Sequence, residues 1–316
     1  MKYKCPLCDF EINSDKYLEK YISDFNNQEY KLYHCLNCDG EWWEPLKIIP
    51  EFYEEEGEIA YDLYHAGIRN IQEWHIPFFK KFFLNQGRLL DIGCGDGVFI
   101  KEAQKLGFEV WGIDFDKKSI EVAKNKFGLK NVFPMSLEEF VDLAKEKDLK
   151  FDVITFFEVL EHQDKPKEFL EQIKILLKPE GYIVGTVPNR ESVFINLYQG
   201  KYDKTDLPPH HFLRFSKKVL KNFFEHQGFS VEISDTKSLT EIATLIEIWL
   251  FGKYTFNLKK KLREKIYLNK NNKNKLFKNN LIKTLKFFRT LFLIPISLFI
   301  YPFIQGAHIY FQGKIK

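Results

Sequence analysis

The sequence has little net charge and few cysteines. Its 316 residues carry a formal charge of +3 at neutral pH, and five residues are cysteine. No signal peptide is visible, since the N-terminal residues lead directly into a polar stretch. We therefore expect a reducing compartment, where paired cysteines favour a metal over a disulfide. Global disorder is excluded, because 45% of the residues are hydrophobic and 32 are phenylalanine.

Acidic residues are nearly missing from one stretch near the C-terminus. Between Lys259 and Arg289 there are twelve basic residues and one acid, Glu264. The net charge of this stretch is +11. Since the whole chain has a net charge of +3, the rest of the chain carries −8. The asymmetry indicates an anionic partner for that stretch alone.

Charged residues are missing altogether from Thr290 to Gly313. The densest apolar run, Leu291–Ile304, has 14 residues. As a helix it would span about 21 Å, which is short of a hydrocarbon core of about 30 Å. Pro295, Pro302 and Gly306 also interrupt it. We expect a monotopic anchor on an anionic membrane surface; a pocket cap or a dimer interface is the alternative.

The middle of the chain alternates between strand and helix patterns, which predicts βαβ units and a mostly parallel sheet covered by helices on both faces. The expected strands are Arg88–Ile92, Phe108–Ile113, Asn131–Phe133, Phe151–Phe157, Tyr182–Val187 and Phe229–Ser234. The expected helices are Val98–Leu106, Lys117–Phe127, Leu137–Lys147, Pro166–Leu177 and Lys217–His226, with residues 51–86 and two later stretches, 239–251 and 281–304, also helical.

A glycine motif joins the first of these strands to its helix. Gly93, Gly95 and Gly97 alternate with other residues, and Asp91 precedes them. Glycines allow a cofactor to approach the backbone at a helix N-terminus. A carboxylate at Asp91 suits a cation, such as S-adenosylmethionine, better than a pyrophosphate. Asp114, which ends the next strand, can accept hydrogen bonds from two ribose hydroxyls.

Three motifs resemble the class I S-adenosylmethionine-dependent methyltransferases of the ubiquinone-biosynthesis type, over Leu89 to Asn189. They read LLDIGCGDG, FDVITFFEVLEHQDKP and LLKPEGYIVGTVPN. The resemblance implies a Rossmann-like core with an antiparallel last strand, which Ala307–Gly313 would supply. It also implies a cofactor site. The residues that would form it are Asp91, Gly93, Gly95, Gly97, Asp114, Phe115, Phe157 and, where the family usually has an acid, Ser136.

Four cysteines form two pairs, Cys5 with Cys8 and Cys35 with Cys38, separated by 26 residues. Four thiolates form a closed tetrahedral zinc site, and a closed site is structural because no position remains for a substrate. A redox pair or free thiols are the alternatives. The arrangement resembles the zinc ribbons that precede some sugar and surface-glycan methyltransferases.

Two histidines are candidate general bases, since a base near neutrality is most naturally histidine. His162 follows the fourth strand. His211, next to His210, lies in a loop that resembles a segment of deoxysugar C-methyltransferases, in which the histidine is the proposed base. A bracing role for His162 and a packing role for His211 are the alternatives. Tyr61, Tyr64 and His65 are a candidate lid, or part of the core.

The sequence predicts a methyltransferase of a small molecule, such as a sugar, a lipid-linked glycan or an isoprenoid-type acceptor, at the cytoplasmic membrane face. The alternative is a non-catalytic module that binds S-adenosylmethionine or a nucleic acid. We expect no nucleic acid, because no loop alternates aromatic residues with arginine. The expected organisation is a zinc ribbon (1–50), a helical linker or lid (51–86), a core (87–236), a basic and apolar helical insertion (237–305) and a closing strand (306–316).

Overall fold

The computed structural model describes residues 2–49, 64–67, 69–193, 206–237, 242–243, 246, 293, 295–301 and 304–316. The chain forms two compact units. The first, the core unit, comprises Met1–Arg190, Thr205–Thr236 and His308–Lys316. The second unit comprises Glu191–Lys204 and Lys237–Ala307.

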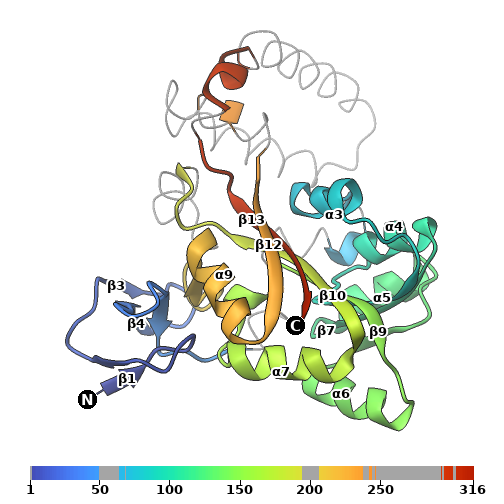
Figure 1. Ribbon diagram of the computed structural model, residues 1–316, viewed down its shortest axis with the longest axis horizontal. Coiled ribbons are helices and arrows are strands. Elements are labelled where there is room, and N and C mark those ends of the chain that lie inside the picture. The colour runs from blue at the N-terminus through green and yellow to red at the C-terminus, as the bar shows by residue number, and fades with distance from the viewer. Residues whose placement is uncertain are drawn as a thin grey trace. The chain divides into compact units, whose positions relative to one another are not determined.

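The core unit is built on a seven-stranded sheet with the order β12-β13-β10-β9-β6-β7-β8 (Figure 1). Strands β6 to β10 run parallel to their neighbours, and β13 runs antiparallel between β10 and β12. The expected closing strand is thereby confirmed. The strands are β6 (Gly87–Ile92), β7 (Phe108–Asp114), β8 (Val132–Pro134), β9 (Phe151–Phe157), β10 (Leu177–Pro188), β12 (Phe229–Thr236) and β13 (His308–Ile315).

Helices cover both faces of this sheet, as the alternating pattern predicts (Figure 1). Along β9, Ile154 and Phe156 pack in one apolar cluster, and Val153 and Phe157 pack in the other. The two faces differ because successive strand residues point to opposite sides. The first face carries α6 (Leu137–Glu146), α7 (Pro166–Leu176) and α9 (Lys217–His226), and the second carries α3 (Ile76–Lys81), α4 (Val98–Leu106) and α5 (Lys117–Asn125).

Two expectations about individual elements are wrong. Residues 73–81 form a short 3-10 helix, η1 (Glu73–His75), followed by α3, and residues 82–86 are not helical. A continuous helix would place Pro77 in its interior, where proline removes a hydrogen bond and clashes with the preceding turn. Strand β10 also begins five residues before Tyr182 and includes the expected turn, with a register irregularity between Leu177 and Tyr182.

The N-terminal residues form two small sheets. Strands β1 (Lys2–Lys4) and β2 (Glu11–Asn13) make a hairpin. The second sheet has the order β11-β5-β4-β3, and its outer strand β11 (Leu213–Arg214) comes from the loop before α9. The N-terminal strands of this sheet are β3 (Glu19–Ile22), β4 (Glu29–His34) and β5 (Glu41–Glu44). The ribbon is therefore joined to the rest of the core unit through the strand β11, which completes its sheet.

The second unit is described at few positions. Residues 295–300 are helical, and Ile296, Leu298 and Phe299 are exposed on them, while the Ser297 hydroxyl donates a hydrogen bond to the Leu293 carbonyl. Of the expected helix at 239–251, only residues 242, 243 and 246 are described, and they are helical; the basic stretch and most of 281–304 lie outside the described residues. Within the part of the chain that the structure describes, no helix has the length and apolar character needed to cross a membrane.

Candidate functional site

The glycine motif forms the turn from β6 into α4 at the carboxyl edge of the parallel strands. Gly93, Gly95 and Gly97 have positive φ angles of 76°, 52° and 78°. Side chains rarely adopt this conformation, so the turn depends on glycine. A Cβ atom at Gly97 would lie 2.5 Å from the Leu129 Cδ1 atom, so close packing of the helix also excludes a side chain there.

Asp91 lies beneath this turn and is almost fully buried. Its Oδ1 atom accepts a hydrogen bond of 2.7 Å from the Thr155 hydroxyl. Burial raises the pKa of Asp91 to about 8, against the opposing effect of Thr155. A carboxyl group in this state is converted to the carboxylate by a nearby cation, so the position suits a positively charged ligand.

Asp114 ends β7 beside the same turn. Its Oδ2 atom accepts a hydrogen bond from the Gly95 amide at 2.8 Å, and its Oδ1 atom accepts one from the Asp116 amide at 2.9 Å. Burial raises the pKa of Asp114 to about 6. A carboxylate has about four acceptor positions, so two remain for a ligand. Phe115, the next residue, is 40% exposed.

Tyr64 lies against the glycine turn, with Arg69 next to it. A Cβ atom at Gly95 would lie 2.6 Å from the Tyr64 ring, and the Arg69 guanidinium lies 3.5 Å from the centre of that ring. His65 Nε2 lies 2.7 Å from Asp116 Oδ2, at the N-terminus of α5. Tyr64 thus lies against the turn, His65 contacts α5, and Tyr61 lies outside the described residues, so the lid stays a prediction.

The other two expected cofactor residues have clear structural roles. Ser136 is the N-cap of α6 and forms a capping box with Glu139. Phe157 is buried, with its ring centre 4.7 Å from that of Phe99 and 4.9 Å from that of His75. Burial lowers the pKa of His75 to about 3, so this imidazole is neutral. Sequence reasoning missed His75 because it expected one continuous helix there.

The structure brings the two candidate bases together in a buried cluster. His162 ends the 3-10 helix η2 (Leu160–His162), and its Nδ1 atom lies 2.5 Å from the His210 carbonyl oxygen. The rings of His210 and His211 are stacked, with centres 4.5 Å apart and planes 17° apart. One nitrogen from each of the three imidazoles lies within 4.8 Å of the others, a separation that also permits a metal ion.

Two buried acids flank this histidine cluster, and sequence reasoning missed both. Asp206 Oδ1 lies 2.8 Å from His211 Nδ1. Glu161 Oε1 lies 3.7 Å from His211 Nε2 and 3.8 Å from His162 Nε2. Burial raises the pKa of Glu161 well above its usual range and lowers the pKa of His162 to about 3. Glu161 lies in the motif EVLEH, which drew attention to its histidine only.

Glu158, at the end of β9, is a further acid at this edge. It has a positive φ of 55°, a strained conformation for a residue with a side chain. Its Oε2 atom lies 3.1 Å from Nδ1 of His308, on β13. His308 was not singled out in the sequence, because the contact depends on the antiparallel insertion of β13.

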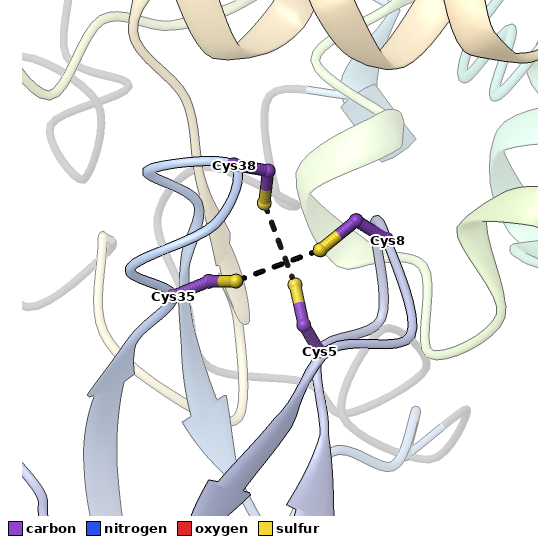
Figure 2. Close-up of side chains that lie close together, drawn as sticks. All are labelled: Cys5, Cys8, Cys35 and Cys38. Atoms are coloured by element: carbon purple, nitrogen blue, oxygen red, sulfur yellow. Dashed lines mark hydrogen bonds between the residues drawn. The ribbon is translucent and has the colours of Figure 1, made fainter.

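The four cysteines of the ribbon converge as their spacing predicts (Figure 2). The Sγ atoms of Cys5 and Cys38 are 3.6 Å apart, and those of Cys8 and Cys35 are 3.5 Å apart. The two turns have the same backbone pattern, since Cys5 N bonds to Phe10 O and Cys35 N bonds to Gly40 O. Hydrogen bonding with Cys5 lowers the pKa of Cys38 to about 5. All four thiols are free of disulfides.

A doubly wound sheet whose carboxyl edge carries a glycine turn between two acids, the buried Asp91 and the partly exposed Asp114, defines the class I methyltransferase fold. The family model for a methyltransferase domain matches residues 64–233, more than half of the chain. The chain therefore belongs to this methyltransferase family. Membership favours an enzyme over a binding module.

Curated relatives agree with this assignment. The mitochondrial ubiquinone biosynthesis O-methyltransferase of Schizosaccharomyces pombe is 31% identical over 151 residues, 46% of this chain and 55% of the relative. That of Paraburkholderia phymatum is 34% identical over 160 residues, 48% of this chain and 68% of the relative. The chain thus spans about half to two thirds of the length of these relatives. A methyltransferase structure from Archaeoglobus fulgidus is 21% identical, covers 80% of this chain and 94% of its own, and has a TM-score of 0.44.

Proposed function

We propose that the protein transfers a methyl group from S-adenosylmethionine to a hydroxyl group of a small molecule. The observation that carries the proposal is the pair of acids on either side of a glycine turn at the carboxyl edge of the sheet, Asp91, which is buried, and Asp114, which is partly exposed. S-adenosylmethionine supplies a methyl group already activated on a sulfonium, so the protein's task is to bind, to orient and to accept a proton.

Asp91 would bind the ammonium of the cofactor, and a bound cation would offset the burial that raises the pKa of this carboxyl to about 8. Gly93, Gly95 and Gly97 would allow the amino-acid part to approach the backbone. Asp114 would accept from the ribose hydroxyls with its remaining acceptor positions. Phe115, half exposed next to it, would lie against the adenine. Phe157 and Ser136 complete the proposed site, although both the amide and the hydroxyl of Ser136 bond to Glu139 in the capping box of α6.

The acceptor follows from the relatives and from the histidine cluster. The relatives are named for O-methylation in ubiquinone biosynthesis, which favours an isoprenoid-type molecule with a hydroxyl group. A sugar or a lipid-linked glycan would present the same reacting group. His211 is the proposed base, and His162 braces the loop through the His210 carbonyl. The base would take the hydroxyl proton as the oxygen attacks the methyl carbon.

The four cysteines would hold one structural zinc ion. A regular tetrahedron with Zn–S bonds of about 2.3 Å has sulfur atoms about 3.8 Å apart. The measured separations of 3.5 and 3.6 Å are close to this value. The proposed role is to fix the two turns against each other.

The second unit would bind the cytoplasmic face of an anionic membrane without crossing it. The exposed side chains of Ile296, Leu298 and Phe299 and the basic composition of residues 259–289 support this. Sedimentation with vesicles of phosphatidylserine and phosphatidylcholine tests the idea, with vesicles of phosphatidylcholine alone as the control. Equal binding to both would remove the anionic surface from the proposal.

Titration calorimetry with S-adenosylmethionine tests the central proposal. We expect binding by the wild type, and weaker binding when Asp91 or Asp114 is replaced. Glu109→Gln is the matched control, because Glu109 lies on the same strand as Asp114 and its side chain is exposed. Absence of binding by the wild type would refute the assignment of the cofactor.

A further inference from the structure

We propose that Asp206 is a positioning residue that fixes His211 with its Nε2 atom as the proton-accepting nitrogen. The proposal rests on the proposed methyl transfer to a hydroxyl. Asp206 and His211 are both buried, and Oδ1 of the acid lies 2.8 Å from Nδ1 of the imidazole. Since an ionised carboxylate only accepts hydrogen bonds, Nδ1 carries the proton and Nε2 presents its lone pair.

The nitrogen that contacts the acid distinguishes this pair from two others. In the pairs His34–Asp39 and His65–Asp116, the acid contacts Nε2 at 2.7 Å in each case. Asp116 also accepts from the Lys118 amide and the Ser119 hydroxyl, so it caps α5. Asp206 instead contacts Nδ1, as Glu158 does in its pair with His308, so Nε2 of His211 faces other groups.

The groups that Nε2 of His211 faces are suited to a hydroxyl group. Glu161 Oε1 lies 3.7 Å from it, and also 3.8 Å from His162 Nε2. Both carboxyl oxygens of Glu161 are buried, and neither has a hydrogen-bond partner among the described residues. Separations of this length are too long for a direct hydrogen bond, but a hydroxyl group or a water molecule beside the two atoms would be within hydrogen-bond reach of both. The acceptor hydroxyl would occupy this position.

The backbone holds the dyad at the carboxyl edge. The Phe212 amide donates to the Glu161 carbonyl at 2.9 Å, and the Trp43 amide donates to the Phe212 carbonyl at 2.9 Å. The residue after His211 is thus fixed on both sides, toward η2 and toward the ribbon sheet. Phe212 is fully buried. The pair of Asp206 and His211 is therefore rigidly supported. A base needs such support if its ring is to keep one orientation.

The stacking of His210 on His211 argues against a metal ion shared by all three histidines. An imidazole binds a metal through a lone pair in the plane of its ring. Planes only 17° apart, with ring centres 4.5 Å apart, cannot both contain the same ion. This geometry favours a base at Nε2 of His211 over a three-histidine metal centre.

The reaction balances on these groups. The acceptor oxygen forms a bond to the methyl carbon as the carbon–sulfur bond breaks, and the bonding electron pair remains on sulfur as a thioether. The hydroxyl proton passes to His211 Nε2. The positive charge of the sulfonium is thereby transferred to the imidazolium, and the adjacent Asp206 carboxylate stabilises that charge.

Long-range ¹H–¹⁵N spectra of the histidine rings test the proposal without an acceptor. The signals of His211 are identified by their loss in the His211→Asn variant. In the zinc-loaded wild type, we expect these signals to show the proton of His211 on Nδ1. Asp206→Ala should remove this preference, and Asp206→Glu should restore it in part. Asp39→Asn, which alters the His34 pair in the ribbon, is the control and should leave the His211 signals unchanged. Thermal unfolding confirms that each variant is folded.

Two results would overturn the proposal. One is a His211 proton on Nε2 in the wild type, or an unchanged tautomer in Asp206→Ala. The other is a second equivalent of zinc, beyond the one bound by the cysteines, that shifts the His211 Nε2 signal, since a metal ligand cannot act as the base. Neither result depends on S-adenosylmethionine binding, so failure of the proposed function is recognised separately by calorimetry.

Discussion

The glycine turn and the histidine cluster lie at the same edge of the sheet but are assembled differently. The turn is made within one strand–helix connection, with Asp91 and Gly97 six residues apart. The cluster joins the end of β9 to a loop more than forty residues later, and a ribbon strand supports that loop. The glycine turn can therefore be predicted from a local sequence motif. The histidine cluster can be recognised only once the tertiary fold is known.

The largest effect should come from removing the zinc ion that we propose for the ribbon. Structural zinc contributes about 10 kcal/mol or more of apparent binding free energy in small zinc domains. We therefore expect Cys35→Ser to lower zinc content and to increase amide exchange in residues 2–49. If the ribbon were independent of the rest of the chain, the increase in amide exchange would be limited to residues 2–49. Because β11 pairs with β5, exchange should also increase at 213 and 214.

Elemental analysis and hydrogen exchange measure these two effects. Cys94→Ala is the matched control, because Cys94 is a free thiol outside the ribbon. Normal protection at 213 and 214 in a zinc-free protein would show that the loop does not depend on the ribbon.

Loss of the base should affect turnover and spare cofactor binding. General-base catalysis typically contributes about 10²–10⁴-fold. With an identified acceptor, His211→Ala should lower kcat by about this factor and leave the calorimetric Kd for S-adenosylmethionine nearly unchanged. His226→Ala, at the exposed end of α9, is the control. A parallel loss of cofactor affinity would place His211 in the packing of the fold instead.

Loss of a cofactor acid should have the opposite pattern. Asp114→Ala should weaken S-adenosylmethionine binding by about 1–3 kcal/mol, because charge-assisted hydrogen bonds to the ribose are lost. The tautomer of His211 should not change. Calorimetry on the variant and on Glu109→Gln gives the comparison, and equal affinities would remove Asp114 from the site.

The smallest effect should be a pH dependence of cofactor binding. The pKa of Asp91 is raised to about 8, so the free protein binds a proton there at neutral pH. An ammonium favours the carboxylate and displaces this proton, so affinity should rise as pH increases from 6 toward 8, by at most tenfold per unit. Thr155→Val removes the hydrogen bond that lowers this pKa and should move the rise to higher pH. An affinity that does not change with pH would exclude Asp91 as the group that binds the ammonium.

Folding stability should change in the opposite direction over part of this range. The folded-state pKa of Asp91 lies above the ordinary value, so the folded state binds more protons than the unfolded state between about pH 4 and 8. The contribution of this group to stability therefore falls as pH rises through that window. Chemical denaturation of the cofactor-free protein at pH 5 and pH 8 measures the difference, and Asp91→Asn should reduce it.

The sequence predicts those parts that depend on periodicity and short spacing. The order of strands and helices, including β9, the cysteine pairs and the glycine turn all came from local patterns, and the closing strand β13 followed from the family resemblance. The sequence did not predict Asp206 or Glu161 as neighbours of His211, because their proximity arises from the path of a loop. It also missed β11, since two residues carry no periodic signal.

The shared strand β11 limits how this protein can be recombined with its relatives. An exchange at the boundary after residue 50 would separate β5 from the strand that it pairs with, and Arg190 from Asp39. A viable chimera should therefore carry residues 2–49 and the loop at 206–216 from the same parent. The ribbon and the loop at 206–216 would thus have to be exchanged together, although more than 150 residues separate them in the chain.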